Sequence, residues 1–284
     1  MNPSRQTTST SKTPAGVFTP ATTRRRSPGS ATSSAAWACV WLVSGWLVLA
    51  AGVTSTGAQP PRAVAAVADG LEELYQRYVT GDGVRYAAWQ ANAGDRRKLG
   101  QAAQFYAATR APADRNESLA WHLNAYNVWV LELIMRVYPV DGPLAADEEF
   151  FERRSITVAG RQMSLNELEH GMIRPRFKEP RIHFAVNCAA ASCPPLHPQP
   201  FAGATLDRTL DRLTRDFVNR HPHGVRSQRG GAVVALSKIF EWYAEDFGGE
   251  QALVNYVNQY RDQALAAGAE VTFLDYDWRL NAAR

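Results

Sequence analysis

The spacing of apolar residues along the chain predicts several helices. Near the start of the folded region, apolar side chains recur every three or four residues, at Leu71, Leu74, Tyr75 and Tyr78. A longer helix is expected at 116–137, where Asp114 can cap the first turn and Pro139 marks the stop. A further helix is predicted at 206–217, with an apolar stripe along one face, and a last helix around 253–266.

Short strands are predicted between these helices. The segment "SITVAGRQMS" at 155–164 has the pattern of a hairpin, and Ser164 with Glu167 can cap the helix after it. The run "AVVAL" before Ser237 predicts another strand, and "EVTFLDYDW" at 270–278 predicts a closing strand. Short strands joined by hairpins and separated by helices indicate an α+β fold, a helix-rich single domain around a small, mainly antiparallel sheet.

The segment "RIHFAVNC" at 181–188 also alternates in the manner of a strand. On that interpretation one face carries Ile182, Phe184, Val186 and Cys188, and the other carries His183 and Asn187. The first set is apolar, so we expect Cys188 to be buried in the core. We expect Cys193 to be more accessible, because it lies in a small-residue loop ahead of two prolines.

The first part of the chain has the pattern of a secretory leader. Residues 1–58 contain five basic residues and no Asp or Glu, and they end in the apolar run "AAWACVWLVSGWLVLAAGV" followed by small residues. This order predicts a signal peptide with cleavage after Ala58, or alternatively after Ala65. A retained membrane anchor is the other interpretation, since the run is just long enough to span a bilayer. We expect 59–67 to be a linker and 68–284 to be the single globular domain.

Removal of this leader changes the charge of the protein. The whole chain has 31 Lys and Arg against 27 Asp and Glu, but the five leader charges are all basic, which leaves 26 against 27. The exported part would then carry a net charge of −1, which gives no reason to expect nucleic acid as a partner. The sequence instead suggests a small-molecule or peptide ligand, with membrane contact only through the leader before cleavage.

The exported part keeps two of the three cysteines, Cys188 and Cys193, and four interpretations are open. In an oxidising compartment the two can form a disulfide across a short loop. One of them can instead be a nucleophile, with His183, His170 or His197 as the base. The spacing is not that of a usual zinc site, and it excludes a C-x-x-C redox centre. No cofactor or metal is therefore predicted.

Several polar residues lie where apolar ones would be expected. Asn124 and Asn127 interrupt the apolar stripe of the long helix, and they either bond neighbouring backbone or hold a substrate carbonyl. His170 either pairs with Glu169 at the surface or takes part in a site. Asp277 follows Tyr276 at the expected end of the last strand, where a carboxylate can bond backbone or orient an imidazole.

Five ordered blocks between Trp121 and Asn281 carry a resemblance: "WHLNAYNVWVLELI", "MSLNELEHGMIR", "RIHFAVNCAAASCPPL", "LSKIFEWYAEDFG" and "FLDYDWRLN". In this order they resemble domain-of-unknown-function family 547, in its exported bacterial branch. The resemblance places the chain in a group without a settled activity. If the blocks build one site, the side chains of His183, Asn124 and His170 should converge although they belong to three separate elements.

Two classes of function follow from these residues. The first is an enzyme of the cell envelope, a thiol- or histidine-assisted hydrolase or acyl transferase. Its predicted catalytic residues are His183, Cys188, His170 and Asp277, and its predicted substrate-binding residues are Asn124, Asn127, Asn187 and Tyr276. The second is a non-catalytic envelope module that binds a ligand or partner, in which the same residues form a structural polar network and the cysteines a staple. A free thiol favours the first class, and a disulfide favours the second.

Overall fold

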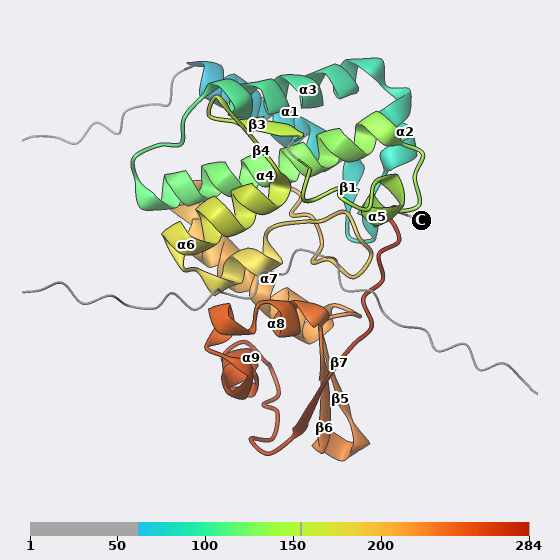
Figure 1. The fold of residues 1–284 in the computed structure, drawn as a ribbon, viewed down its shortest axis with the longest axis vertical. Coiled ribbons are helices and arrows are strands. Elements are labelled where there is room, and N and C mark those ends of the chain that lie inside the picture. The colour runs from blue at the N-terminus through green and yellow to red at the C-terminus, as the bar shows by residue number, and fades with distance from the viewer. Residues whose placement is uncertain (1–61, 154, 284) are drawn as a thin grey trace, which may run out of the picture.

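The computed structural model describes residues 62–153 and 155–283 and confirms a helix-rich α+β fold with small sheets (Figure 1). The predicted signal peptide at 1–58 lies outside the described residues. The first helix, α1 (Arg62–Tyr78), begins inside the segment 59–67 that was expected to be a linker. In the described part of the chain, no helix combines the length and the apolar character that a membrane span requires.

Helices form the upper layer in Figure 1, around the central helix α4 (Arg115–Val137). The predicted cap is confirmed, because the Asp114 carboxylate accepts bonds from the backbone N–H groups of Asn116 and Glu117, both at 2.9 Å. The helix is apolar almost all round and is therefore buried between its neighbours. The other elements of this layer are α1, β1 (Val79–Thr80), β2 (Gly83–Val84), α2 (Tyr86–Ala91), α3 (Ala93–Ala108) and α5 (Pro143–Ala146), of which α3 and α5 pack directly on α4.

The predicted hairpin and the cap after it are both present. Strands β3 (Ile156–Val158) and β4 (Arg161–Met163) pair antiparallel. The Ser164 hydroxyl accepts from the Glu167 N–H at 3.0 Å, and the Glu167 carboxylate accepts from the Ser164 N–H at 2.8 Å. The capped segment is a π-helical turn, Glu167–Ile173, which leads into α6 (Arg174–Phe177).

The prediction of a strand at 181–188 is wrong. Residues Pro180–Phe184 form a 3₁₀ helix, and the chain then turns without pairing in a sheet. The Glu179 side chain caps this helix by accepting from the Arg181 N–H at 3.2 Å, and the N–H groups of Ala185 and Val186 both bond the Ile182 carbonyl. These local bonds satisfy the backbone groups that a strand would have to pair with a neighbour.

The lower layer holds the largest sheet, with strand order β5 (Val225–Gln228), β6 (Val233–Leu236), β7 (Glu270–Phe273). Strands β5 and β6 are antiparallel, and β6 and β7 are parallel. The last helix and the last strand are both shorter than predicted. The helices of this layer are α7 (Leu206–Arg220), α8 (Lys238–Trp242) and α9 (Leu253–Asn258), with short 3₁₀ turns at Gly203–Thr205, Arg229–Gly231, Ala244–Phe247 and Glu250–Ala252.

Two apolar cores correspond to the two layers, and the segment Pro180–Phe184 joins them. Ile182 packs in the core around α4, whereas Phe184 packs in the core around β6, α8 and α9. The site described below lies at this junction, so both cores hold its walls in place.

The end of the chain returns from the lower layer to the upper one, as the red tail in Figure 1 shows. On its way the tail bonds the loop that carries the cysteines, through the Arg279 carbonyl with the Ala191 N–H at 2.7 Å and the Asn281 N–H with the Ala189 carbonyl at 3.0 Å. Gly142 is required beside it, because a Cβ there would lie 2.1 Å from the Trp278 carbonyl oxygen. The tail therefore fixes the cysteine loop against the helical layer.

Candidate functional site

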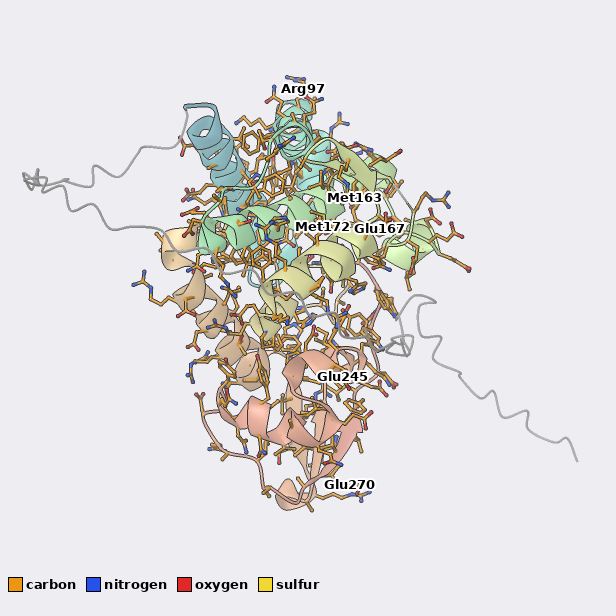
Figure 2. All side chains as sticks on the ribbon, turned by 60° about the vertical axis from the view of Figure 1, so that its left-hand side comes forward. Arg97, Met163, Glu167, Met172, Glu245 and Glu270 are labelled. Atoms are coloured by element: carbon orange, nitrogen blue, oxygen red, sulfur yellow. The ribbon has the colours of Figure 1, made fainter. Side chains whose placement is uncertain are left out.

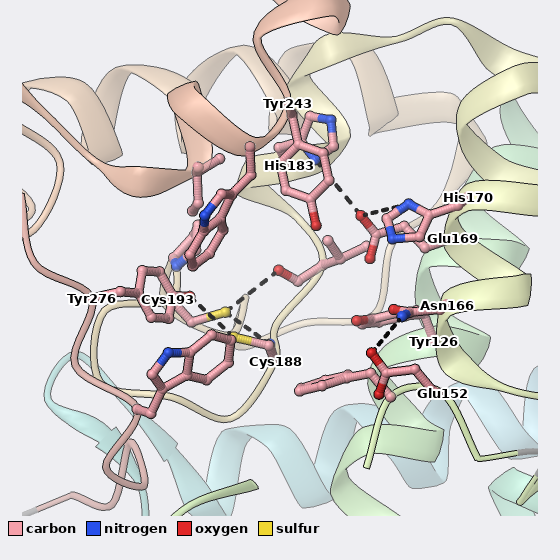
Figure 3. Close-up of a pocket in the computed structure, with 16 residues that line it drawn as sticks. Tyr126, Glu152, Asn166, Glu169, His170, His183, Cys188, Cys193, Tyr243 and Tyr276 are labelled. Atoms are coloured by element: carbon pink, nitrogen blue, oxygen red, sulfur yellow. Dashed lines mark hydrogen bonds and ion pairs between the residues drawn. The ribbon is translucent and has the colours of Figure 1, made fainter. Parts of the chain in front are cut away.

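A cavity of about 80 Å³ lies at the junction of the two layers (Figure 3). Residues from both layers and from the tail line it. Its lining is mainly aromatic and apolar, with thiol, imidazole and carboxyl groups among these side chains: Tyr126, Phe151, Glu152, Asn166, Glu169, His170, His183, Val186, Cys188, Cys193, Pro194, Ile239, Trp242, Tyr243, Tyr276 and Trp278. Segments far apart in the sequence thus supply one compact site.

Amide side chains hold the cysteine loop in position. Asn127 donates to the Ala185 carbonyl at 2.9 Å and accepts from the Asn187 N–H at 2.8 Å. Asn187 in turn donates to the Pro194 carbonyl at 2.8 Å and accepts from the Ala189 N–H and from the Asn281 side chain. The buried amides therefore bond backbone groups of the loop. For Asn127 this is the structural role, rather than the binding of a substrate carbonyl.

Asn124 has the same structural role at a different loop. Its amide donates to the Phe201 carbonyl at 2.9 Å and accepts from the Phe201 N–H at 2.8 Å. It does not belong to the cavity lining, whereas His183 and His170 do. Asn187 is likewise absent from the lining.

We expect Asn127→Ala to lower the free energy of unfolding by about 2–4 kcal/mol, because the change leaves a buried carbonyl and a buried N–H without partners. Asn116→Ala, on the exposed first turn of the same helix, should stay within about 0.5 kcal/mol of wild type. Urea unfolding followed by circular dichroism measures both. Equal stability of the two variants would contradict the clamp assigned to Asn127.

The two cysteines have the opposite burial to the one expected. Cys188 is partly exposed, whereas Cys193 is 5% exposed, because the segment is a turn and the alternation of a strand does not apply. Both are free thiols, so the proposed disulfide staple is not seen. The Cys193 sulfur instead accepts the Cys188 backbone N–H at 2.8 Å. Cys193 thus supports the loop, and Cys188 presents its thiol to the cavity.

The environment of Cys188 favours its thiolate. Burial alone raises the pKa of this thiol, but hydrogen bonds from Cys193, Tyr276 and the backbone of Ala190 outweigh it and hold the pKa below its ordinary value. The Tyr276 hydroxyl lies 3.2 Å from the Cys188 sulfur. Burial, followed by electrostatic interaction with Cys188 and Cys193, raises the pKa of Tyr276 well above its usual range, so the phenol keeps its proton and acts as a donor. Burial and the bond to Cys188 raise the pKa of Cys193 well above its usual range.

His183 is held on one side by a carboxylate that the sequence did not single out. Its side chain is 1% exposed, its Nε2 lies 2.7 Å from Asp246 Oδ2, and its ring stacks on Tyr243 with 4.0 Å between centroids. Arg174 binds the same carboxylate through two bonds, at 2.6 and 3.0 Å. Burial raises the pKa of Asp246, but the bonds from His183 and Arg174 overcome this and hold it well below its ordinary value.

This pairing defines which nitrogen of the ring donates to Asp246. Because the Asp246 carboxylate is ionised and can only accept, Nε2 of His183 must donate to it. The other ring nitrogen, Nδ1, faces Glu169, with 3.8 Å between Nδ1 and Glu169 Oε1. Neither Nδ1 of His183 nor Oε1 of Glu169 has a hydrogen-bond partner among the described residues. A basic nitrogen and a buried carboxylate oxygen therefore lie together at the cavity wall.

His170 also lines the cavity, at the edge of the π-helical turn. Its Nδ1 lies 3.1 Å from Arg174 and 3.9 Å from Glu169. Burial lowers its pKa, and the charge of Arg174 adds to this against the opposing effect of Glu169. The third imidazole considered as a base, His197, lies outside this cavity beside Arg212, where burial and then the Arg212 charge lower its pKa to about 4.

Asp277 does not orient an imidazole of this site. Strand β7 ends at Phe273, so Asp277 lies in the tail, where its carboxylate pairs with the side chain of Arg279. It lines a second cavity of about 1370 Å³, which Cys193 also borders. The role predicted for Asp277 is occupied by Asp246, from the 3₁₀ turn after α8.

Among the residues that the structure adds to the site are Tyr126, Glu169, Tyr243 and Asp246. Each lies in one of the five sequence blocks, so membership of those blocks was the available signal. In the resolved ranges 62–153 and 155–283, no group of three or more His, Cys, Asp or Glu side chains could hold a metal ion. Figure 2 places Glu167 and Met172 on the upper layer and Glu245 on the lower one.

The comparisons with known proteins agree with the family expected from the blocks. The model of the family described as "Protein of unknown function, DUF547" matches residues 111–218. The matched range holds α4, the π-helical turn and the cysteine loop, whereas Asp246 and Tyr276 lie beyond it. No curated protein matches the chain. No solved structure matches it either. Over residues 111–218 the chain is thus similar to the DUF547 family, whose description assigns no function.

Proposed function

We propose that the cavity is the active site of a thiol-dependent hydrolase or acyl transferase. One observation carries the proposal. The partly exposed thiol of Cys188, whose pKa is lowered, shares a cavity with the buried imidazole of His183, and the Asp246 carboxylate holds that ring through Nε2. Cys188 would be the nucleophile, His183 the acid–base group through Nδ1, and Asp246 the positioning residue. Tyr276 would stabilise the thiolate before attack.

The reaction would proceed in two steps that balance. The Cys188 thiol gives its proton to Nδ1 of His183, and the thiolate attacks the acyl carbon and forms a thioester. The bond to the leaving group breaks as that group takes the proton from Nδ1. In the second step water, or another acceptor, loses a proton to Nδ1 of His183 and attacks the thioester. The acyl product departs and the thiolate is restored. The aromatic walls around the sulfur limit the access of bulk water during the first step.

Iodoacetamide labelling of the full chain, mapped by peptide mass spectrometry, tests the reactivity of the proposed nucleophile. Cys188 should be labelled at pH 7 much faster than Cys193, whose pKa is raised well above its usual range. Cys193→Ser serves as the matched variant and should leave the labelling of Cys188 in place. Preferential labelling of Cys193, or no labelling of Cys188 in the folded protein, would overturn the proposal.

Tyr276→Phe should slow this labelling about 3- to 10-fold at pH 7, the effect of losing one hydrogen bond to the thiolate. The sign follows from the direction of the shift: with one donor removed the pKa of Cys188 rises, so less thiolate is present at a given pH below it. The ring contacts with Trp242 and Trp278 remain in the variant. The pH profile of labelling should therefore move to higher pH, and an unchanged profile would contradict the role of Tyr276.

A ligand-binding module is the second candidate. It is favoured by the contacts of the Cys188 sulfur, because among the described residues its hydrogen-bond partners include Tyr276 but no imidazole. Catalytic hydrogen bonds often form only when substrate is bound, so this geometry fits both candidates. They differ in one respect: an acyl adduct on Cys188 forms and turns over in the enzyme and does not form in the module.

We also propose that the protein acts outside the cytoplasm. The support is the acid-free basic segment followed by an apolar run in residues 1–58. Intact mass of the protein from the cell envelope should show a chain shortened near Ala58, and full-length protein in the cytoplasm would contradict export.

A further inference from the structure

The wall of the cavity has an unbalanced set of charges. Two carboxyl side chains, Glu152 and Glu169, line it, and its lining contains neither lysine nor arginine. Glu152 accepts a bond from Asn166 at 3.2 Å, but Oε1 of Glu169 has no partner in the described part of the chain. Glu169 is 4% exposed. A buried carboxylate oxygen without a donor is costly, so the cavity lacks a hydrogen-bond donor at this point.

A neighbouring polar atom makes this lack larger. Nδ1 of His183 lies 3.8 Å from the same oxygen and, because Nε2 donates to Asp246, it is also an acceptor in the neutral ring. Two buried acceptors thus lie side by side at the cavity wall without a donor between them. A group with several N–H or O–H donors at this point would satisfy both.

The aromatic residues around the cavity indicate which donor fits. Trp242, Tyr276 and Trp278 pack together with ring centroids 4.6 to 5.9 Å apart, and Tyr243 lies at the opposite side against His183. Faces of tryptophan and tyrosine rings attract cations, and a buried carboxylate adds direct attraction. A cavity of about 80 Å³ has room for a group of a few non-hydrogen atoms.

We propose that the cavity binds a primary ammonium group between Glu169 and His183, so that the substrate is a small acyl compound with a free amine close to its acyl carbon. The binding site follows from the cavity alone. The substrate class rests on the proposed function, because it needs Cys188 as the nucleophile. The acyl carbon would then lie at the sulfur while the amine lies at Glu169, both within one small cavity.

Binding at Glu169 and reactivity at Cys188 should be coupled. The charge of Glu169 opposes ionisation of the Cys188 thiol. A cation bound at Glu169 cancels this charge, so thiolate formation becomes easier when the ammonium site is filled. By thermodynamic linkage, the thiolate form should bind the cation more tightly than the thiol form. A substrate amine would therefore activate the nucleophile that attacks its own acyl group.

Methylammonium chloride is the probe, with sodium chloride at the same ionic strength as the salt control and methanol as the uncharged probe of similar size. Titration of the full chain, followed by tryptophan fluorescence, should show saturable binding of methylammonium in the millimolar range. Glu169→Gln should weaken it at least tenfold, and Glu148→Gln, an exposed carboxylate outside the cavity, should not. Equal binding of methanol by wild type, or no loss in Glu169→Gln, overturns the site.

The second measurement does not need a variant. The pH profile of Cys188 labelling should move to lower pH when methylammonium is present and stay unchanged with sodium chloride. Methylammonium binding without an acyl adduct on Cys188 would uphold the ammonium site and refute the enzyme. An acyl adduct on Cys188 without methylammonium binding would uphold the enzyme and refute the ammonium site. If Glu169→Gln does not fold, the comparison of methylammonium with methanol in wild type decides the result.

Discussion

Cys188→Ser should lower kcat/KM for acyl transfer from p-nitrophenyl acetate by at least about 1000-fold, because serine at this position lacks the thiolate on which the reaction depends. The local structure should tolerate the change, since Cys188 is partly exposed and serine can still accept the hydrogen bond from Tyr276. Release of p-nitrophenol, followed by absorbance, measures the rate.

Cys193→Ser is the matched control for this loss. It removes the other free thiol of the loop while leaving an atom that can accept the Cys188 N–H. It should retain most of the activity, and any loss should accompany a lower unfolding midpoint. Equal rates for Cys188→Ser and wild type, with both proteins folded, would show that the thiol takes no part in the reaction.

Asp246→Asn should lower kcat/KM about 100-fold or more, because the neutral amide no longer holds His183 in the form that leaves Nδ1 free. Asp246 is a positioning residue, so its effect should pass through the imidazole. In a His183→Ala background the same substitution should add little further loss. Steady-state rates of the four proteins complete this cycle.

Glu245→Gln is the matched control for Asp246→Asn. Glu245 precedes Asp246 in the same 3₁₀ turn and is exposed, so its replacement should leave the rate near that of wild type. A purely structural Asp246 would show additive losses with His183→Ala and a fall in stability that accounts for them. Such additivity would remove the positioning role.

The difference in stability between wild type and Asp246→Asn should depend on pH. The folded-state pKa of Asp246 lies below its ordinary value of 3.8, since the bonds from His183 and Arg174 outweigh burial. A carboxyl group whose folded-state pKa is lowered stabilises the fold at pH values above its ordinary pKa. This contribution is lost as the pH falls through the folded-state pKa. The stability gap between wild type and Asp246→Asn should therefore narrow on acidification below about pH 3.8.

Secondary structure could be predicted from the sequence where local patterns and local bonds agree. The long apolar helix with Asp114 at its start, the hairpin at 155–164 and the Ser164–Glu167 capping box depend on residues a few positions apart, and the structure confirms all three. The segment 181–188 could not be predicted in this way, because its alternation suits a strand while Glu179 and Pro180 start a 3₁₀ helix. The burial expected for both cysteines was wrong for that reason.

The site was predicted in part. His183, Cys188, His170 and Tyr276 do line one cavity, although they come from three separate blocks. Asp246 was missed because its partner His183 lies 63 residues away, and a single sequence contains no sign of that pairing. Asp277 was assigned its role on the assumption that the last strand continued to it, but β7 ends at Phe273 and the tail turns towards the cysteine loop. Long-range placement of loops is the information that the pattern lacked.

The identity of the acylated residue tests the central claim most directly. The full chain is mixed with p-nitrophenyl acetate, quenched in acid within the first turnover and mapped by peptide mass spectrometry. We expect an acetyl group on Cys188 that hydroxylamine removes, that is absent from Cys188→Ser and that accumulates in His183→Ala, where the second step lacks its base. Acetylation of other residues while Cys188 remains a free thiol would contradict it.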